Sequence, residues 1–148
     1  MNDASLAVFV DGAANYFSTI SKQDANIGAP FLTQNINQHL CDYTGIIGIS
    51  GDKKGSVFFS APKSMLIKLV ASLGVLTTQD DKLMDLVGEV SNTISGNARR
   101  EFGEQFMLSV PVVIQGKSEG LKVTNVAEIY VIPISWNHFS ANLIINLE

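Results

Sequence analysis

A carboxylate and a carboxamide three residues apart, Glu89 and Asn92, are the two side chains of this sequence best suited to chemistry. They occur in the run Asp85-Leu-Val-Gly-Glu89-Val-Ser-Asn92. Residues three or four apart lie on the same side of a helix, so the two polar groups would project together. Side by side they can hold a water molecule and a cation. The pattern therefore predicts a site that positions water beside a charged group.

The segment around this pair has the apolar period of a long amphipathic helix. Thr78 is expected to begin the helix, with Asp81 completing a capping box, and Gly103 is expected to end it. A helix of about 24 residues is roughly 36 Å long at 1.5 Å per residue. Its expected core face consists of Leu83, Val87, Val90, Ile94 and Ala98, flanked by Leu86 and Phe102.

The opposite face of this helix carries a straight stripe made of Asp85, Glu89, Asn92 and Gly96. Stability alone does not favour these residues. Like charges at i and i+4 destabilise a helix by a few tenths of a kcal/mol, and a mid-helix glycine costs about 1 kcal/mol relative to alanine. A glycine also removes bulk where another protein could approach. Two interpretations stay open here: an ordinary acidic surface with Gly96 easing packing, or a functional site.

In the rest of the chain, apolar residues recur about every 3.6 residues in some segments, which predicts helices, and about every 2 residues in others, which predicts strands. Helices are expected over 4–21 and 62–73, and strands over 43–50, 56–61, 106–114, 121–125, 128–134 and 141–147, with an extended piece over 30–34. The order predicts an α+β fold with a largely antiparallel β-sheet packed against helices, and residues 1–148 as a single domain. Strand 128–134 is a candidate edge for pairing with a second copy.

Composition excludes several classes of protein. The chain has 148 residues, of which 46% are apolar and 16% charged, a globular balance. A net charge of -4 argues against a nucleic-acid surface. No apolar run approaches the roughly 18 to 20 residues of a membrane span, and no signal peptide is evident. A single cysteine, Cys41, fits a reducing compartment, so a cytoplasmic location is expected.

Other chemical groups are weaker candidates. His39 and Cys41 lack the second ligand pair of a zinc site, and nothing marks Cys41 as an activated nucleophile, so no metal site is expected. The glycines between 45 and 55 lack the order of a phosphate-binding loop. For Trp136 two interpretations stay open: it anchors a partner, or it closes one end of the core.

The stretch Gly88 to Ala98 reads G-E-x-x-N-x-I-x-G-N-A, and it is followed by a segment that carries Pro111. With Asp85 four residues before Glu89, it resembles the CheC/CheX/FliY family of chemotaxis phosphatases. The hairpin before Pro62 and the final strands fit the same fold. The first helix has Asp11 and Asn15 but no E-x-x-N, so the chain is most similar to the single-site CheX branch.

The resemblance implies hydrolysis of the aspartyl phosphate on a CheY-like receiver domain. It assigns catalysis to Glu89 and Asn92, with Asn92 orienting water and Glu89 pairing with a receiver lysine, and partner contacts to Asp85 and Gly96. It implies no cofactor of the chain's own, Mg²⁺ supplied by the receiver, and a homodimer. The alternative is a non-catalytic receiver-binding or dimerising scaffold with the same fold.

Overall fold

The described residues form one eight-stranded sheet at the centre of the fold, and its paired strands are all antiparallel. The computed structural model describes residues 1–116 and 127–148. The strands lie in the order β1-β7-β8-β4-β3-β5, with β2 also against β7 and β6 also against β3. The elements are α1 (Asp3–Thr19), β1 (Asn26–Ile27), β2 (Phe31–Thr33), η1 (Ile36–His39), β3 (Tyr43–Gly51), β4 (Gly55–Ala61), α2 (Lys63–Ser72), α3 (Asp80–Phe102), β5 (Phe106–Leu108), β6 (Val112–Gln115), β7 (Ile129–Trp136) and β8 (Phe139–Leu147).

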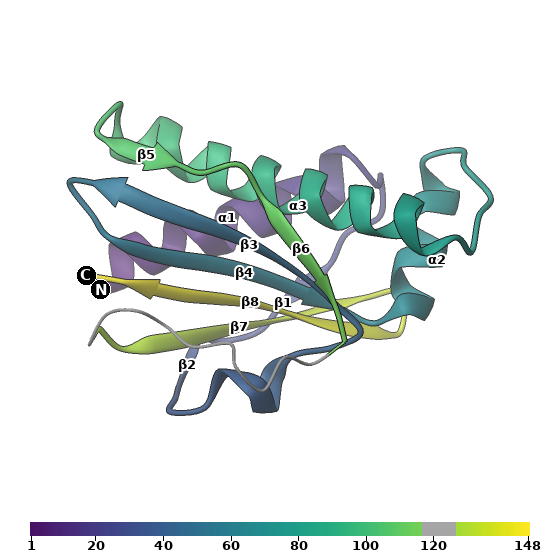
Figure 1. Cartoon of the computed structure of the whole chain (residues 1–148), viewed down its shortest axis with the longest axis horizontal. Helices are drawn as coiled ribbons and strands as arrows, with labels where there is room; N and C mark the ends of the chain where they lie inside the picture. Colours follow the sequence, from purple (N-terminus) through teal and green to yellow (C-terminus); the bar gives the residue numbers. More distant parts are fainter. Residues whose placement is uncertain (117–126) are drawn as a thin grey trace.

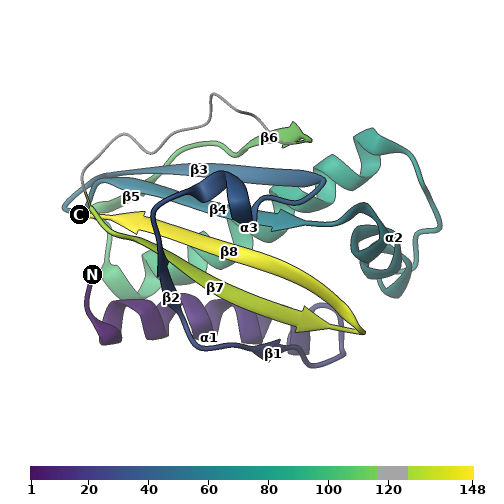
Figure 2. The same cartoon turned by 90° about the horizontal axis from the view of Figure 1, so that it is seen from below.

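Helices α1 and α3 cover one face of the sheet, and the short helix η1 lies on the other (Figures 1 and 2). The predicted α+β class and antiparallel sheet are therefore confirmed. No helix among residues 1–116 and 127–148 has the length and apolar character needed to cross a membrane. The expected strand over 121–125 lies outside the described residues.

Two tight hairpins fix the register of the central strands. Gly51 and Gly55 both have positive φ, 95° and 154°, at the β3–β4 turn. Between β7 and β8, Asn137 and His138 adopt φ values of 48° and 67°, which is the pattern of a two-residue type I′ turn. Trp136 and Phe139 pair directly across that turn. His138 is therefore a turn residue.

Trp136 closes one end of the main core. Its side chain is buried, its ring lies 6.0 Å from that of Phe17, and its indole N–H donates to the carbonyl of Gln23 at 3.1 Å. Of the two roles that the sequence left open for this residue, the structure gives the internal one. A second, smaller cluster lies on the opposite face of the sheet and consists of Ile36, Leu40, Phe58, Ile129, Val131 and Ile144.

Helix α3 packs unusually close to strand β3. A Cβ atom on Gly45 would come within 2.3 Å of the Ser91 hydroxyl oxygen and 3.0 Å of a Val87 methyl. Only glycine at this position allows that approach. The five expected core residues of α3 are all fully buried, as the apolar period predicted.

Three local expectations are wrong. The strand over 106–114 is interrupted, because residues 109–111 oppose only two residues of β3 between the pairs Ile49–Leu108 and Ile46–Val112, which makes a β-bulge. Strand 128–134 is not an edge, because β1 and β2 pair with the outer side of β7. The capping box is absent: Gln79 is the N-cap of α3, without a side-chain hydrogen bond.

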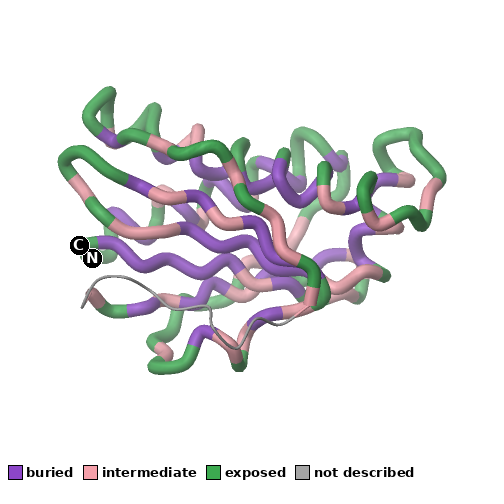
Figure 3. The backbone as a smooth tube through the Cα atoms, viewed as in Figure 1, coloured by how far each residue is buried: buried purple, intermediate pink, exposed green. Residues whose placement is uncertain are grey.

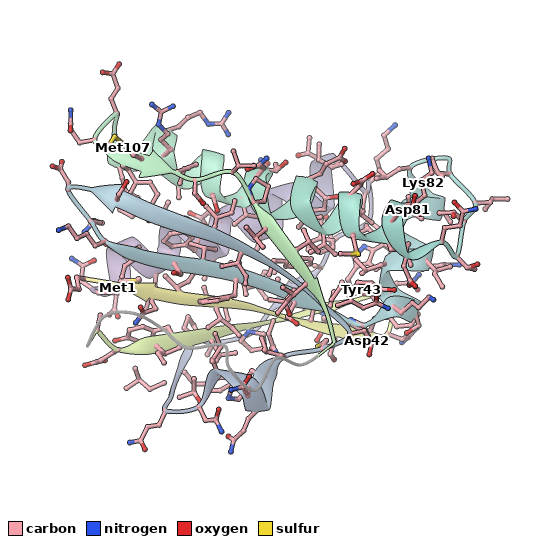
Figure 4. All side chains as sticks on the ribbon, viewed as in Figure 1. Met1, Asp42, Tyr43, Asp81, Lys82 and Met107 are labelled. Carbon is pink, nitrogen blue, oxygen red and sulfur yellow. The ribbon has the colours of Figure 1, made fainter. Side chains whose placement is uncertain are left out.

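A polar cluster fastens the start of α3 to its neighbours. The Tyr43 hydroxyl donates to the Asp80 carboxylate, and the Lys63 ammonium lies 3.2 Å from the same group. These hydrogen bonds, first the one from Tyr43, lower the pKa of Asp80 below its ordinary value. Burial and the bond to Asp80 raise the pKa of Tyr43 to about 12. The cluster joins β3, α2 and α3 where the long helix begins (Figure 4).

The Gly45→Ala substitution should destabilise the protein by about 1–3 kcal/mol, as overpacking of a tight core does. The added methyl must push α3 away from β3. Gly48→Ala, on the other face of the same strand, is the control, because its Cβ would meet only ordinary contacts at 3.5 Å and beyond. Urea unfolding measures both. Equal losses for the two variants would contradict the close packing described here.

The Asp80→Asn substitution should cost stability at neutral pH and less in acid. Folding lowers the pKa of Asp80, so its contribution is complete above the ordinary value of 3.8 and is lost as the pH falls through the lowered value. Urea unfolding of both proteins at a series of pH values down to about 3 gives the comparison. The two stability curves should converge in acid; curves that stay parallel would exclude this linkage.

Candidate functional site

The four residues singled out by the sequence all lie on the outer side of α3. Asp85, Glu89 and Asn92 are exposed, and Gly96 is partly exposed. The helix runs without a break through Gly88. Figure 3 shows the alternation of buried and exposed positions along α3. In Figure 4, Asp81 and Lys82 mark the start of α3, and Met107 lies beside its far end.

Helix α1 forms one shoulder of this surface. Tyr16 on α1 is buried, and its pKa is raised to about 12, first by that burial and second by the nearby charge of Glu89. Tyr16 therefore stays neutral at physiological pH and leaves the Glu89 carboxylate as the local charge. Further along, the backbone at Gly12 approaches Asn97: a Cβ there would lie 3.2 Å from the Asn97 amide nitrogen. Close packing of the two helices holds α3 in place.

The segment that contains the β-bulge forms the other shoulder. A Cβ on Gly88 would meet Val113 at 3.6 Å and Pro111 at 3.8 Å, so both side chains lie against α3. Ser109 fixes the bulge, since its hydroxyl accepts from the Gly48 N–H at 2.8 Å. Pro111 therefore supports the helix from the side, one turn before Asn92.

Charges change sign along the outer face of α3. The first half carries three acidic residues, Asp81, Asp85 and Glu89, against one lysine, Lys82. The middle has the neutral Asn92, and the last turn carries Arg99 and Arg100 beside Glu101. In the described part of the chain, no three His, Cys, Asp or Glu side chains gather as metal ligands would. What the surface offers is an exposed amide on a rigid helix, between a carboxylate and two cations, which can orient water and recognise a charged partner.

The sequence interpretation missed a hollow at the end of this surface. A depression of about 380 Å³ is lined by Gly96, Arg99, Arg100, Gly103, Glu104 and Leu108. The two arginines lie in the last turn of α3, where the helix dipole by itself favours positive charge. Nothing in the sequence brings Leu108 to this place, because the strand pairing that positions it is a long-range contact.

Comparison with known proteins relates this chain to chemotaxis proteins. A family model described as chemotaxis phosphatase CheX matches residues 43–135. A chemotaxis protein from Desulfovibrio vulgaris Hildenborough is 31% identical, with a TM-score of 0.83 over 98% of this chain and 97% of that one. A CheC-like superfamily protein from Shewanella sp. PV-4 is 25% identical, with a TM-score of 0.88 over 100% and 99%.

A third relative was solved as a CheX–CheY–BeF₃–Mg²⁺ complex from Borrelia burgdorferi. It is 18% identical, with a TM-score of 0.77 over 97% of each chain, which shows a shared fold. No curated protein matches the sequence. The CheC/CheX-like fold expected from the sequence is confirmed by these structures. The match of the family model over most of the chain, joined to 31% identity along nearly the whole of a solved relative, shows that this chain belongs to the CheX family.

Proposed function

We propose that this protein hydrolyses the aspartyl phosphate of a CheY-like receiver domain, with Glu89 and Asn92 as the catalytic residues. The observation that carries the proposal is the exposure of both side chains on one unbroken helix of a CheX-family chain. The Borrelia relative was crystallised with CheY, BeF₃ and Mg²⁺, which supports a receiver as the partner.

Asn92 is assigned the positioning of water. Phosphoryl transfer needs positioning and charge stabilisation more than covalent help from the protein. A neutral amide can approach the negatively charged phosphoryl group without repulsion. Its carbonyl oxygen would accept from the water while the water oxygen attacks phosphorus in line. The bond between phosphorus and the aspartyl oxygen breaks, inorganic phosphate leaves, and the aspartate carboxylate is regenerated.

Glu89 is assigned to docking. A carboxylate is a poor neighbour for a phosphate, so it makes sense at this site only if a cation faces it. A lysine of the receiver is that cation in our proposal. Tyr16, kept neutral by burial, adds no second negative charge beside Glu89 on the α1 side. Asp85, one turn earlier and also exposed, extends the acidic rim of the contact.

The proposal has three further parts. Residues 1–148 act as one CheX-like domain, the Mg²⁺ of the reaction is held by the receiver, and the protein works in the cytoplasm as a homodimer. The homodimer follows from the family resemblance, and light scattering of the purified protein measures it. The scaffold alternative differs in one result: the protein would bind a beryllofluoride-loaded receiver without speeding phosphate loss.

The Asn92→Ala substitution should slow receiver dephosphorylation by about 100-fold or more, because small losses of positioning cost that much. The melting temperature should change little, since the side chain is exposed. The assay follows phosphate loss from a receiver domain labelled with acetyl phosphate. Asn15→Ala is the matched control, an exposed asparagine of α1. Equal rates for the two variants would rule out the role given to Asn92.

The Glu89→Gln substitution should weaken receiver binding most at low salt, because it removes one half of a charge pair. Affinity for a beryllofluoride-loaded receiver, measured at several salt concentrations, should fall less steeply with salt than it does for the wild type. Glu101→Gln removes the same charge from another exposed position of α3 and is the control. If the two variants show the same salt dependence, Glu89 does not pair with a receiver cation.

A further inference from the structure

The hollow beside the catalytic pair has no role in the mechanism proposed above. It begins at Gly96, one turn beyond Asn92, which places it about 6 Å further along the helix axis. Its floor and walls come from the last turns of α3, from Gly103 after the helix, and from Leu108 on β5. A partner that placed a phosphoryl group at Asn92 would also cover this hollow.

Among the residues that the structure describes, none requires a glycine at position 96. Its φ is not positive, and a Cβ atom added to it would meet nothing within 4 Å. Gly45 is the contrast, since its missing Cβ is required by the packing of α3 against β3. A mid-helix glycine destabilises a helix relative to alanine. Within residues 1–116 and 127–148, therefore, no packing contact accounts for Gly96, and the space above it is open.

Charged side chains surround this open space. Arg99 and Arg100 line it, and Arg100 is held by a hydrogen bond of 3.0 Å from its guanidinium to the Asn97 side-chain oxygen. Glu104 is the one carboxylate among its lining residues, while Leu108 supplies apolar surface. The hollow therefore combines an apolar floor with two cations. It fits an apolar side chain that has an acidic neighbour.

We propose that this hollow is a second docking point, which receives an apolar side chain flanked by a carboxylate on the receiver domain. The inference rests on the proposed function, because the receiver is the occupant. Charge complementarity argues for it: the first half of α3, where carboxylates outnumber Lys82, would face the cations of the phosphorylation site, and the arginine half would face the opposite sign. Two contacts of opposite polarity fix the direction in which the receiver lies on α3. The hollow thereby determines which receivers are accepted.

Two substitutions test the docking point by steady-state dephosphorylation of a phosphorylated receiver. Gly96→Leu fills the hollow, and Arg99→Glu reverses its charge. Each should raise KM about 10-fold or more and leave kcat within about 2-fold, the signature of lost binding without lost transition-state stabilisation. Lys68→Glu makes the same change of charge at an exposed position of α2 and should leave KM unchanged.

Stability separates docking from a structural role. Gly96→Ala should raise the melting temperature by about 2–4 °C, because it improves helix propensity and meets no neighbour. Gly96→Leu should melt no lower than the wild type, and light scattering should give all variants the wild-type mass. A lower melting temperature or a changed mass would overturn the docking role, because the hollow would then serve folding or self-association.

The two proposals fail differently. If the wild-type protein does not speed phosphate loss from any receiver tested, the proposed function fails. If the wild type is active and both Gly96→Leu and Arg99→Glu keep the wild-type KM, the docking point fails while the phosphatase stands. A fall in kcat without a change in KM would also overturn it, because the hollow would then act on the reaction and not on binding.

Discussion

The close seating of α3 on β3 is the constraint on which the rest of this structure depends. Gly45 lets the helix approach until the Ser91 hydroxyl fills the space where a Cβ would lie. Ser91 donates to the carbonyl of Val87 at 2.8 Å, so its polar atom is satisfied inside the helix. One face of α3 is thereby held without freedom to rotate, and the opposite face is fixed outward. A surface that must place an amide within a fraction of an ångström needs such a support.

The two shoulders, helix α1 and the bulged segment, border the outer face of α3 on either side. Helix α1 brings a neutral, buried Tyr16 to the Glu89 side, and the bulged segment brings Pro111 to the Gly88 side. Neither shoulder adds a competing charge to the middle of the stripe. The balance of charge along the helix axis therefore shifts from acidic, despite Lys82, to basic at Arg99 and Arg100. A partner of matching polarity can dock in one direction, and the side chain at the point of sign change is Asn92.

The sequence predicted this helix well because its evidence is local. A 3.6-residue period over 23 residues overrides weak propensities, and all five core positions and all four stripe positions fell on the expected sides. The errors concern tertiary pairing. The backbone N–H and the hydroxyl of Ser109 both form hydrogen bonds with Gly48, and the bulge made there brings Pro111 against α3. The sequence near Ser109 contains no local signal that predicts this pairing. The cover that β1 and β2 give to β7 comes from two very short strands, which carry too little periodic signal to be recognised.

Two glycines show most directly that the sequence cannot distinguish between different physical reasons for the same residue type. Gly45 lies in strand β3 and Gly96 in helix α3, and from the sequence alone either glycine could be explained by close packing. The structure assigns them opposite causes: at Gly45 a methyl group would collide with α3, and at Gly96 it would enter open space. A residue that costs helix stability and relieves no contact within the described chain points to something beyond it. In our two proposals, the outer face of α3 therefore acts from the stripe as far as the arginines, with recognition and catalysis on neighbouring turns of one helix.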